Sequence, residues 1–303
     1  MLKTVIKYAA FGAFALGAGT TAAQAANNIT PATAQPGETA GLAMGAPLPE
    51  GVYFVNTLDW GVRKFKGEDL KVAVDIPVIA WSTPWTIIGA NLQFLVATPM
   101  VHRDAPGGAL DDYGFYNPFT AAKLAWDLGG GFGVSYLSGI YWNAGDKALR
   151  NRSTTWRQDF AISYTGDGWN LSANLIWGLH FDTDKQIKRL QGGQNSDGFN
   201  LDLTATKTFG KWEIGAVGYG LYEYDLPKGL RGSGKAKSFA VGPLVGYNFG
   251  PVILQSYLTR EVYARNLFEN SGGKSRKDTR FWTRIIIPLW TPAAPAAPLV
   301  TKY

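Results

Sequence analysis

Histidine, the most frequent catalytic base in enzymes, occurs only twice in this chain of 303 residues, and cysteine is absent. His180 with Ser172 or Ser196 would supply a base and a nucleophile, but no motif places these residues together. His180 with Asp182 and Asp184 offers ligand atoms for a metal ion, but without the spacing of a metal site. We instead interpret His180 as a spacer at the base of a loop. We therefore predict no catalytic residue, no metal ion and no cofactor.

Charged and amide side chains instead recur at alternate positions of apolar segments. A charge on the lipid face of a membrane barrel costs about 2–4 kcal/mol at the bilayer midplane, so such residues are expected to face a lumen. There they would form a polar track for solutes, or pair with one another and brace neighbouring strands; the pattern allows both. The predicted lumen-lining residues are Asp59, Arg63, Asp75, Asn91, Arg157, Asp159, Asn174, His180, Asp202, Glu213, Glu261, Arg280 and Arg284.

Residues 169–181 show the alternation most clearly. Every odd-numbered residue from Trp169 to Phe181 is apolar, whereas Ile176 is the one strongly apolar residue among the even-numbered ones. Successive side chains of a strand point to opposite faces, so this segment has one oily and one wet face. It is about twice as long as a strand of a soluble sandwich. Because similar segments follow one another, the sequence predicts an all-β fold, a transmembrane antiparallel up-and-down β-barrel.

Short turns and long loops alternate between these segments, as in outer-membrane barrels with periplasmic turns and external loops. The predicted turns are Thr83-Pro84, Gly129-Gly130, Gly166-Asp167, Gly210 and Gly250, and the predicted long loops lie near residues 102–117, 144–153, 183–196, 226–236 and 268–277. We predict about 12 strands, near residues 51–66, 69–82, 85–101, 118–128, 131–143, 154–165, 168–182, 197–209, 211–225, 237–249, 251–267 and 278–290. A barrel of this size has a narrow passage, which we expect to be narrowed further by Tyr53, Tyr141, Tyr219 and Trp282.

The two ends of the chain differ from the barrel in composition. Residues 1–25 begin with lysines, continue with an apolar run and end in a small-x-small pattern, which predicts a cleaved secretory signal peptide. Residues 26–50 are rich in Ala, Thr, Gly and Pro, and form either a flexible N-terminal segment or a partial plug in the lumen. The barrel then occupies residues 51–290. Residues 291–303 are a tail rich in proline and alanine, and proline cannot donate to a ladder.

The formal net charge is +6, but many lysines and arginines fall in predicted loops rather than along one helix or sheet face. This distribution argues against nucleic acid as a partner. For an exported protein, the phosphates of the outer leaflet are the better counter-charge. We expect outer-membrane lipid and lipopolysaccharide as partners, a small-molecule solute as cargo, and a location in the bacterial outer membrane.

Several segments carry a resemblance to a known family. Residues 49–56, Pro-Glu-Gly-Val-Tyr-Phe-Val-Asn, resemble the P-x-G-x-Y-x-x-N opening of the proteins called MetA-pathway of phenol degradation. Residues 124–131, 168–173 and 240–247 are similar to later blocks of that family, in the same order. The resemblance implies an outer-membrane channel-like protein, linked in some relatives to uptake of phenols and other aromatic hydrocarbons, without catalytic residues. At residues 189–193 the chain departs from the family's tyrosine-arginine-serine-glycine run, so an outer loop differs.

We interpret the chain as an outer-membrane channel for passive uptake of small hydrophobic or aromatic compounds. The residues themselves predict a barrel with a narrow, mixed lumen, whereas the aromatic cargo comes from the resemblance. Two alternatives stay open. One is a structural or adhesion barrel with a blocked lumen, and the other, less favoured, is a lipid-modifying outer-membrane enzyme.

Overall fold

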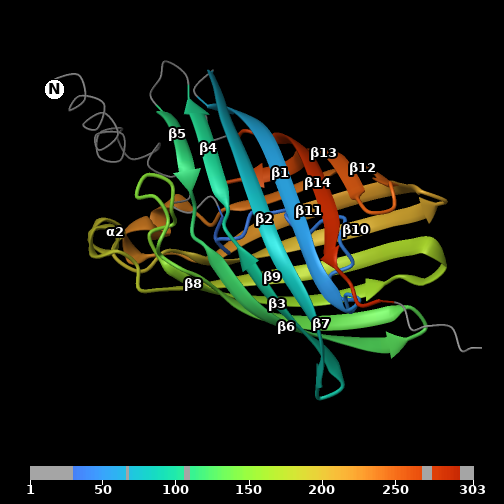
Figure 1. Ribbon diagram of the computed structural model, residues 1–303. Helices are drawn as coiled ribbons and strands as arrows, with labels where there is room; N and C mark the ends of the chain where they lie inside the picture. The colour runs from blue at the N-terminus through green and yellow to red at the C-terminus, as the bar shows by residue number, and fades with distance from the viewer. Residues whose placement is uncertain (1–29, 66–67, 106–109, 268–274, 294–303) are drawn as a thin grey trace, which may run out of the picture.

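The computed structural model describes residues 30–65, 68–105, 110–267 and 275–293 (Figure 1). The predicted signal peptide and most of the predicted C-terminal tail lie outside the described residues. The described chain forms one antiparallel sheet that closes on itself, because β1 (Gly51–Phe65) pairs with both β2 (Glu68–Ile87) and β14 (Thr279–Trp290). The prediction of an antiparallel barrel of about 12 strands is confirmed.

Fourteen strands occupy the twelve positions of the barrel wall. Along β2, β4 pairs with the first half and β3 with the second half, and β5 and β6 divide the next position in the same way. The remaining strands pair in chain order. Their bounds are β3 (Ala90–Ala97), β4 (Met100–Ala105), β5 (Leu110–Phe115), β6 (Phe119–Gly129), β7 (Phe132–Tyr141), β8 (Thr154–Tyr164), β9 (Trp169–Phe181), β10 (Asp197–Phe209), β11 (Trp212–Asp225), β12 (Lys237–Asn248) and β13 (Ile253–Arg265).

Prolines account for the two interruptions. Pro99 lies between β3 and β4, and Pro118 lies between β5 and β6, and neither has an N–H to donate to the ladder. The chain nevertheless stays attached to its neighbours there. Thr98 N donates to Pro77 O at 3.3 Å, and Tyr116 N donates to Pro99 O at 2.8 Å. The wall therefore continues through both breaks.

The first predicted turn, Thr83-Pro84, is wrong. β2 continues to Ile87, with an irregular register between Ser82 and Thr86, and the turn is made by Ile88 and Gly89. Their φ values of 52° and 75° give the left-handed backbone that suits a two-residue hairpin. The proline signalled a local irregularity within the strand rather than its end.

The predicted long loop at residues 102–117 is also wrong. β4 and β5 continue the wall as a hairpin, paired from Met100 with Phe115 to Ala105 with Leu110. The external connections at residues 182–196 and 226–236 are longer. They carry α2 (Lys185–Gln191) and η3 (Lys228–Ser233), whereas η2 (Gly166–Gly168) is one of the short turns at the opposite end. Among the described residues, no helix has the length and apolar character to span a membrane.

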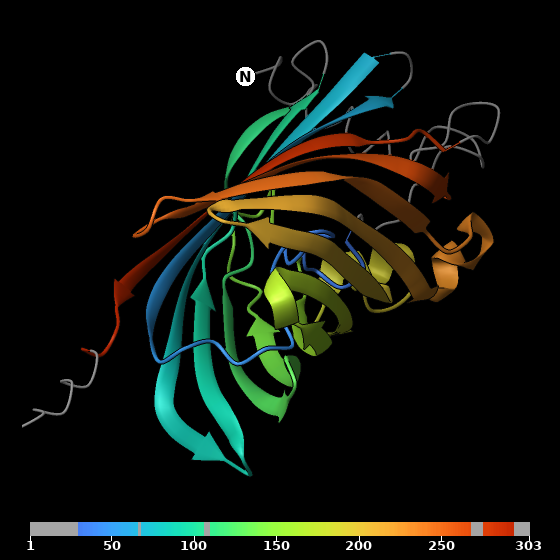
Figure 2. The ribbon, with the colours of Figure 1, turned by 90° about the vertical axis from the view of Figure 1, so that its right-hand side faces the viewer.

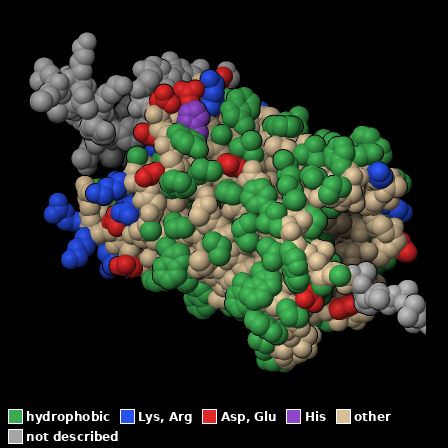
Figure 3. Space-filling model, viewed as in Figure 1, with side chains coloured by type: hydrophobic (Ala, Val, Ile, Leu, Met, Phe, Trp, Pro, Cys, Tyr) green, Lys and Arg blue, Asp and Glu red, His purple; other side chains and the backbone are tan. Residues whose placement is uncertain are grey.

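Inner and outer faces alternate along the strands. On β8, Thr155, Arg157 and Asp159 are at most 4% exposed, whereas Phe160 and Ile162 are 47% and 51% exposed. Many large hydrophobic residues of the strands are exposed, mainly Trp, Phe, Leu and Ile, and Figure 3 shows hydrophobic side chains spread over the outer wall. A wall that exposes large apolar side chains and buries charges is inverted relative to a soluble protein, as a lipid environment requires.

The inner and outer faces of β2 are the reverse of the prediction. Asp75 was predicted to line the lumen, but it lies directly opposite Leu58, which is 41% exposed on the outer face. Asp75 therefore points outward. Its neighbours Val74 and Ile76, each 7% exposed, point inward. The rule that the apolar face contacts lipid failed because both faces of this strand are largely apolar.

Asp75 gives a direct test of this assignment. Its Oδ1 atom is buried and has no hydrogen-bond partner among the described residues. We expect Asp75→Leu to raise the free energy of unfolding by about 1–3 kcal/mol, because the substitution removes an unsatisfied carboxylate from the outer face. Asp59→Leu is the matched control and should be destabilising, because Asp59 accepts hydrogen bonds from Arg280 and Gln35 inside the barrel. Denaturant titration in lipid vesicles measures the free energy of unfolding of both variants. A loss of stability in Asp75→Leu as large as that in Asp59→Leu would contradict the outward position of Asp75.

Candidate functional site

Residues 30–50 lie inside the barrel, where Figure 2 shows them as the blue chain between the walls. We call residues 30–50 the luminal segment. Ala32, Ala34 and Ala40 of this segment are completely buried. Consecutive tight turns make it compact: Thr33 N donates to Thr30 O at 2.7 Å, and comparable bonds follow at residues 38, 40, 42 and 46. Small side chains suit this course, because a chain that folds back on itself within a narrow lumen leaves little room.

Asp202 on β10 holds the middle of the luminal segment. Its carboxylate accepts hydrogen bonds from Gly37 N at 2.9 Å, from Thr39 N at 2.9 Å and from Thr39 Oγ1 at 2.7 Å. Two residues further along β10, Thr204 Oγ1 accepts a hydrogen bond from Gly41 N at 2.7 Å. Hydrogen bonds to a charged acceptor contribute about 1.5–3 kcal/mol each, so Asp202 is a strong anchor.

Arg284 on β14 binds the carbonyl side of the same stretch. Its guanidinium donates to Glu38 O and to Ala40 O, both at 2.6 Å. The remaining donors reach Thr57 Oγ1 at 2.9 Å and Gln255 Oε1 at 3.0 Å, and the side chain is fully buried. Asp202 and Arg284 thus satisfy N–H and C=O groups of a backbone that has no strand partner.

Glu38 is the charged residue at the centre of the luminal segment. Its carboxylate forms an ion pair with Arg157 on β8. Arg157 also binds Asp159 through two parallel bonds of 2.8 Å and donates to Tyr141 Oη at 2.9 Å. The side chains of Glu38 and Arg157 are 9% and 4% exposed, and their ion pair joins the luminal segment to β8.

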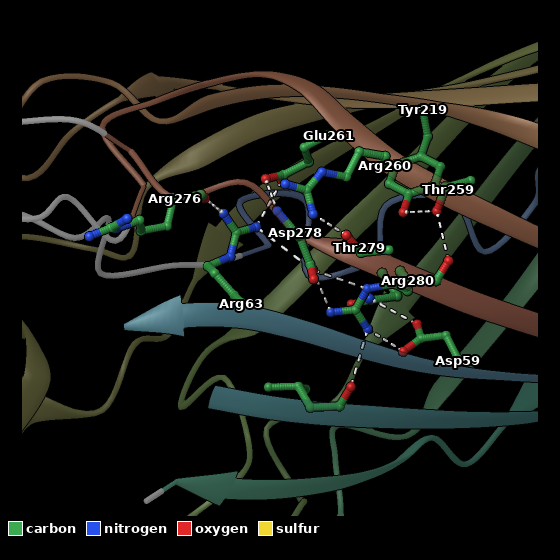
Figure 4. Close-up of polar contacts among 12 residues, drawn as sticks. Asp59, Arg63, Tyr219, Thr259, Arg260, Glu261, Arg276, Asp278, Thr279 and Arg280 are labelled. Atoms are coloured by element: carbon green, nitrogen blue, oxygen red, sulfur yellow. Dashed lines mark hydrogen bonds and ion pairs between the residues drawn. The ribbon is translucent and has the colours of Figure 1, made fainter. Parts of the chain in front are cut away.

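A second ionic network lies nearer the external loops, on β1, β13 and β14 (Figure 4). Arg63 pairs with Glu261 at 2.8 Å and with Asp278 at 3.7 Å. Arg280 pairs with Asp278 at 2.9 Å and with Asp59. These partners come from three neighbouring strands, so the network braces the wall while its carboxylates and guanidinium groups also face the lumen.

The predicted lumen-lining residues other than Asp75 all lie on inner faces. Several of them contact the luminal segment directly: Asn174 Nδ2 donates to Thr39 Oγ1 at 3.1 Å, and Asp59 accepts from Gln35. Near the short turns, Asn91 donates to Thr83 O, and Glu213 binds Thr206, so these two stay within the wall. The structure therefore uses the polar residues as braces and as anchors for an internal chain.

The wall opposite these anchors is apolar. Inward-facing aliphatic and aromatic side chains of β2, β3, β4, β6 and β7 form a continuous stripe that we call the apolar wall. It consists of Val72, Val74, Ile76, Val78, Leu95, Ala97, Val101, Phe119 and Leu137. A lumen that only had to carry ions or sugars would not need such a stripe, because apolar surface is unfavourable in contact with water.

Two cavities lie between the apolar wall and the luminal segment. The upper cavity, toward the external loops, has a volume of about 280 Å³ and contacts Val74, Val101 and the ionic network. The lower cavity, toward the periplasm, has about 350 Å³ and contacts Val78, Leu95 and Leu137. Glu38, Ile76 and Tyr141 line both cavities. The two spaces therefore meet at the Glu38–Arg157 pair, which forms the partition between them.

His180 takes part in a structural contact. Its Nδ1 lies 3.2 Å from Asp197 Oδ1, and its Nε2 lies 3.0 Å from Thr33 Oγ1 of the luminal segment. Ser172 belongs to another group, with its hydroxyl 2.7 Å from Ser163 Oγ. The structure therefore does not assemble a His180–Ser172 pair. The described residues also contain no group of three or more His, Asp or Glu side chains arranged to hold a metal ion.

Two functional residues, Glu38 and Asp278, were missed by sequence reasoning. Glu38 belongs to a stretch without periodicity, although its isolation among Ala, Thr and Gly was a signal that this carboxylate has a partner elsewhere. Asp278 starts the last predicted strand and was not assigned to the lumen. Lys123 is 5% exposed on the inner face of β6, where it lines the lower cavity.

Comparisons with known proteins agree with this geometry. The model of the family described as "Putative MetA-pathway of phenol degradation" matches residues 43–276. Among solved structures, the COG4313 outer membrane channel from Pseudomonas putida F1 is similar with a TM-score of 0.60 at 14% identity, covering 84% of this chain and 99% of that chain. No curated protein sequence matches this chain significantly.

More distant barrels are also similar. The beta domain of the Bordetella autotransporter BrkA has a TM-score of 0.46 at 10% identity, covering 79% of this chain and 100% of that chain. The NanC porin has a TM-score of 0.45 at 9% identity, with 77% and 100% covered. At 14% identity, the likeness to the COG4313 channel shows the fold alone. The shared fold is an outer-membrane barrel.

The anchoring role of Asp202 can be measured by hydrogen exchange. We expect Asp202→Ala to speed exchange of the Gly37 and Thr39 amides at least tenfold, since these N–H groups lose their acceptor. Asp127→Ala is the control, because Asp127 accepts a bond from Gly129 N at a periplasmic turn and does not contact the luminal segment. Unchanged protection at residues 37–39 in Asp202→Ala would show that other contacts hold the segment.

Proposed function

This chain belongs to the family described as putative MetA-pathway of phenol degradation, and we propose that it is an outer-membrane channel for passive uptake of small hydrophobic or aromatic compounds. The export route would be the predicted signal peptide at residues 1–25. The apolar wall, with a cavity on each side of the partition, is the observation that carries this proposal.

The chemistry of the cavities suits small apolar solutes. Small-molecule sites are mostly apolar, with a few placed polar groups, and have volumes of about 300–1,000 Å³. Both cavities lie near the lower end of this range, so each holds one small solute rather than an oligosaccharide. Phe119 and Tyr141, with ring centroids 4.5 Å apart, add aromatic surface on which a flat solute can stack.

Passage between the cavities requires a change at the partition. Glu38 and Tyr141 contact both spaces, and the Glu38 carboxylate is tied to Arg157. Arg157 keeps Asp159 as a second partner, so loss of the Glu38 contact does not leave a buried arginine without a carboxylate. We therefore propose that the Glu38–Arg157 pair is the gate.

One observation favours the alternative of a structural barrel. The luminal segment fills much of the interior and is anchored by Asp202 and Arg284. A barrel that never opens would have the same anchors. It would not need an apolar wall beside the segment, and a transport measurement separates the two functions. The contacts of His180 with Thr33 and Asp197 favour a structural role for this histidine over an enzymatic one.

The decisive experiment is transport by the full-length protein in planar bilayers and in vesicles that contain lipopolysaccharide, with phenol, glucose and ions compared. We expect phenol uptake above that of protein-free vesicles, and an increase of about threefold or more in Glu38→Ala, because the smaller side chain joins the two cavities. Glu213→Ala is the control, since Glu213 binds Thr206 and Gln255 away from the partition.

Two results would contradict the proposal. A folded protein that passes no solute, both as wild type and as Glu38→Ala, would favour the barrel with a blocked lumen. Uptake that is equal in wild type and Glu38→Ala would show that the path avoids the partition. Heat-modifiable migration on gels provides the check that each variant has folded.

We also propose lipopolysaccharide phosphates as the partner of the external loops. Lys185, Lys188 and Arg189 on α2 and Lys228 and Arg231 on η3 are exposed, and Figure 3 shows basic side chains gathered at this end. Clustered cations attract anionic headgroups. Replacing all five with glutamine should lower the lipopolysaccharide retained by the purified protein by half or more. Retention equal to wild type would contradict this assignment.

A further inference from the structure

The lower cavity contains one charged group whose purpose the barrel itself does not explain. Lys123 lies on the inner face of β6, between Gln93 on β3 and Leu137 on β7. Only 5% of this residue is exposed, and it lines the lower cavity. The other residues that line this cavity are mostly apolar, including Leu42, Val55 and others of the apolar wall.

The other charged groups beside the lower cavity are two carboxylates that share one guanidinium group. Glu38 pairs with Arg157, and Arg157 binds both oxygens of Asp159. Asp159 Oδ2 also accepts a hydrogen bond from Asn174. Lys123 forms no hydrogen bond or ion pair with any residue in the part of the chain that the structure describes. Glu38, Asp159, Arg157 and Lys123 are together neutral, but the ammonium group of Lys123 lacks a hydrogen-bond acceptor among the described residues.

A buried ammonium group without a partner is unfavourable unless water or an anion compensates it. A lysine that only braced the wall would be expected to pair with a carboxylate, as Arg63 and Arg280 do in the ionic network. A lysine at an apolar surface of the lumen is instead arranged like a solute site, in which apolar walls hold the body of a ligand and a polar group fixes its orientation.

We propose that the lower cavity binds small hydrophobic acids, with an aromatic or aliphatic body against the apolar wall and a single carboxylate on Lys123. This inference rests on the proposed channel function and narrows its solutes to monoanions. One ammonium group balances one negative charge, so a carboxylate fits better than a phosphate. A neutral phenol would offer the ammonium group of Lys123 only an uncharged acceptor, which makes a weaker hydrogen bond than a carboxylate. When the solute leaves the lower cavity, its carboxylate leaves Lys123 and is hydrated by water.

Binding tests this inference without any need for transport. The full-length protein in detergent is dialysed at pH 6.5 against labelled benzoate or benzyl alcohol, which have similar size and differ in charge, and protein-free micelles are subtracted. We expect wild type to bind benzoate at least tenfold more tightly, which is ~1.4 kcal/mol. Lys123→Met should abolish this preference and leave benzyl alcohol binding unchanged, and Lys123→Arg should retain it.

The matched control is Lys207→Met. Lys207 carries the same side chain at the periplasmic half of the barrel, but it lies over the ring of Trp169 on the outer wall, 4.9 Å from the centroid. Its substitution should leave benzoate binding unchanged. If Lys123→Met does not fold, Lys123→Gln replaces it with the same expectation.

Equal binding of benzoate by wild type and a folded Lys123→Met variant would overturn the inference, as would a wild type with no preference for benzoate over benzyl alcohol. These results are distinct from a failure of the proposed function. Phenol flux without charge-selective binding would support the channel and remove the role of Lys123. Charge-selective binding without flux would leave the Lys123 site in place in a barrel that does not transport.

Discussion

A backbone within a membrane must satisfy every N–H and C=O group from the protein itself, because the surrounding lipid offers no hydrogen bonds. This constraint closes the sheet through β1 and β14 and determines how a chain without a strand partner can occupy the lumen. The luminal segment depends on it most. Its amides and carbonyls are bound by side chains that project inward, with Asp202 as acceptor and Arg284 as donor. The charged side chains of the interior therefore replace, for the luminal segment, the hydrogen bonds that a neighbouring strand would supply.

That requirement divides the lumen into two sides. The polar side chains that anchor the middle of the luminal segment come mainly from β8, β9, β10, β13 and β14, whereas the inner faces of β2, β3, β4, β6 and β7 form the apolar wall. The cavities lie along the second side. Solute and segment thus do not compete for the same groups. An apolar path can exist beside a strongly hydrogen-bonded chain because the two use opposite walls.

Alternation was sufficient to predict the barrel, since strands such as residues 169–181 have one apolar and one polar face. It failed where both faces are apolar: on β2, Asp75 was the only clear polarity signal near the middle of the strand, and it points outward. It also gave no information on the luminal segment, whose contacts join residues more than 100 positions apart, such as Glu38 with Arg157. Local patterns determine strands, but pairings across the lumen depend on closure, which no single segment encodes.

The strengths of the anchors bear on how the lumen opens. Withdrawing the luminal segment would break the bonds to Asp202, Thr204 and Arg284 together, each contributing about 1–3 kcal/mol, with further loss from residues 32–34. Rotation of the Glu38 side chain breaks one ion pair and leaves Arg157 bound to Asp159. Opening by a local change is therefore much less costly than withdrawal. In the proposed channel, the luminal segment is then a permanent part of the wall, and the passage is as narrow as the space between this segment and the apolar wall.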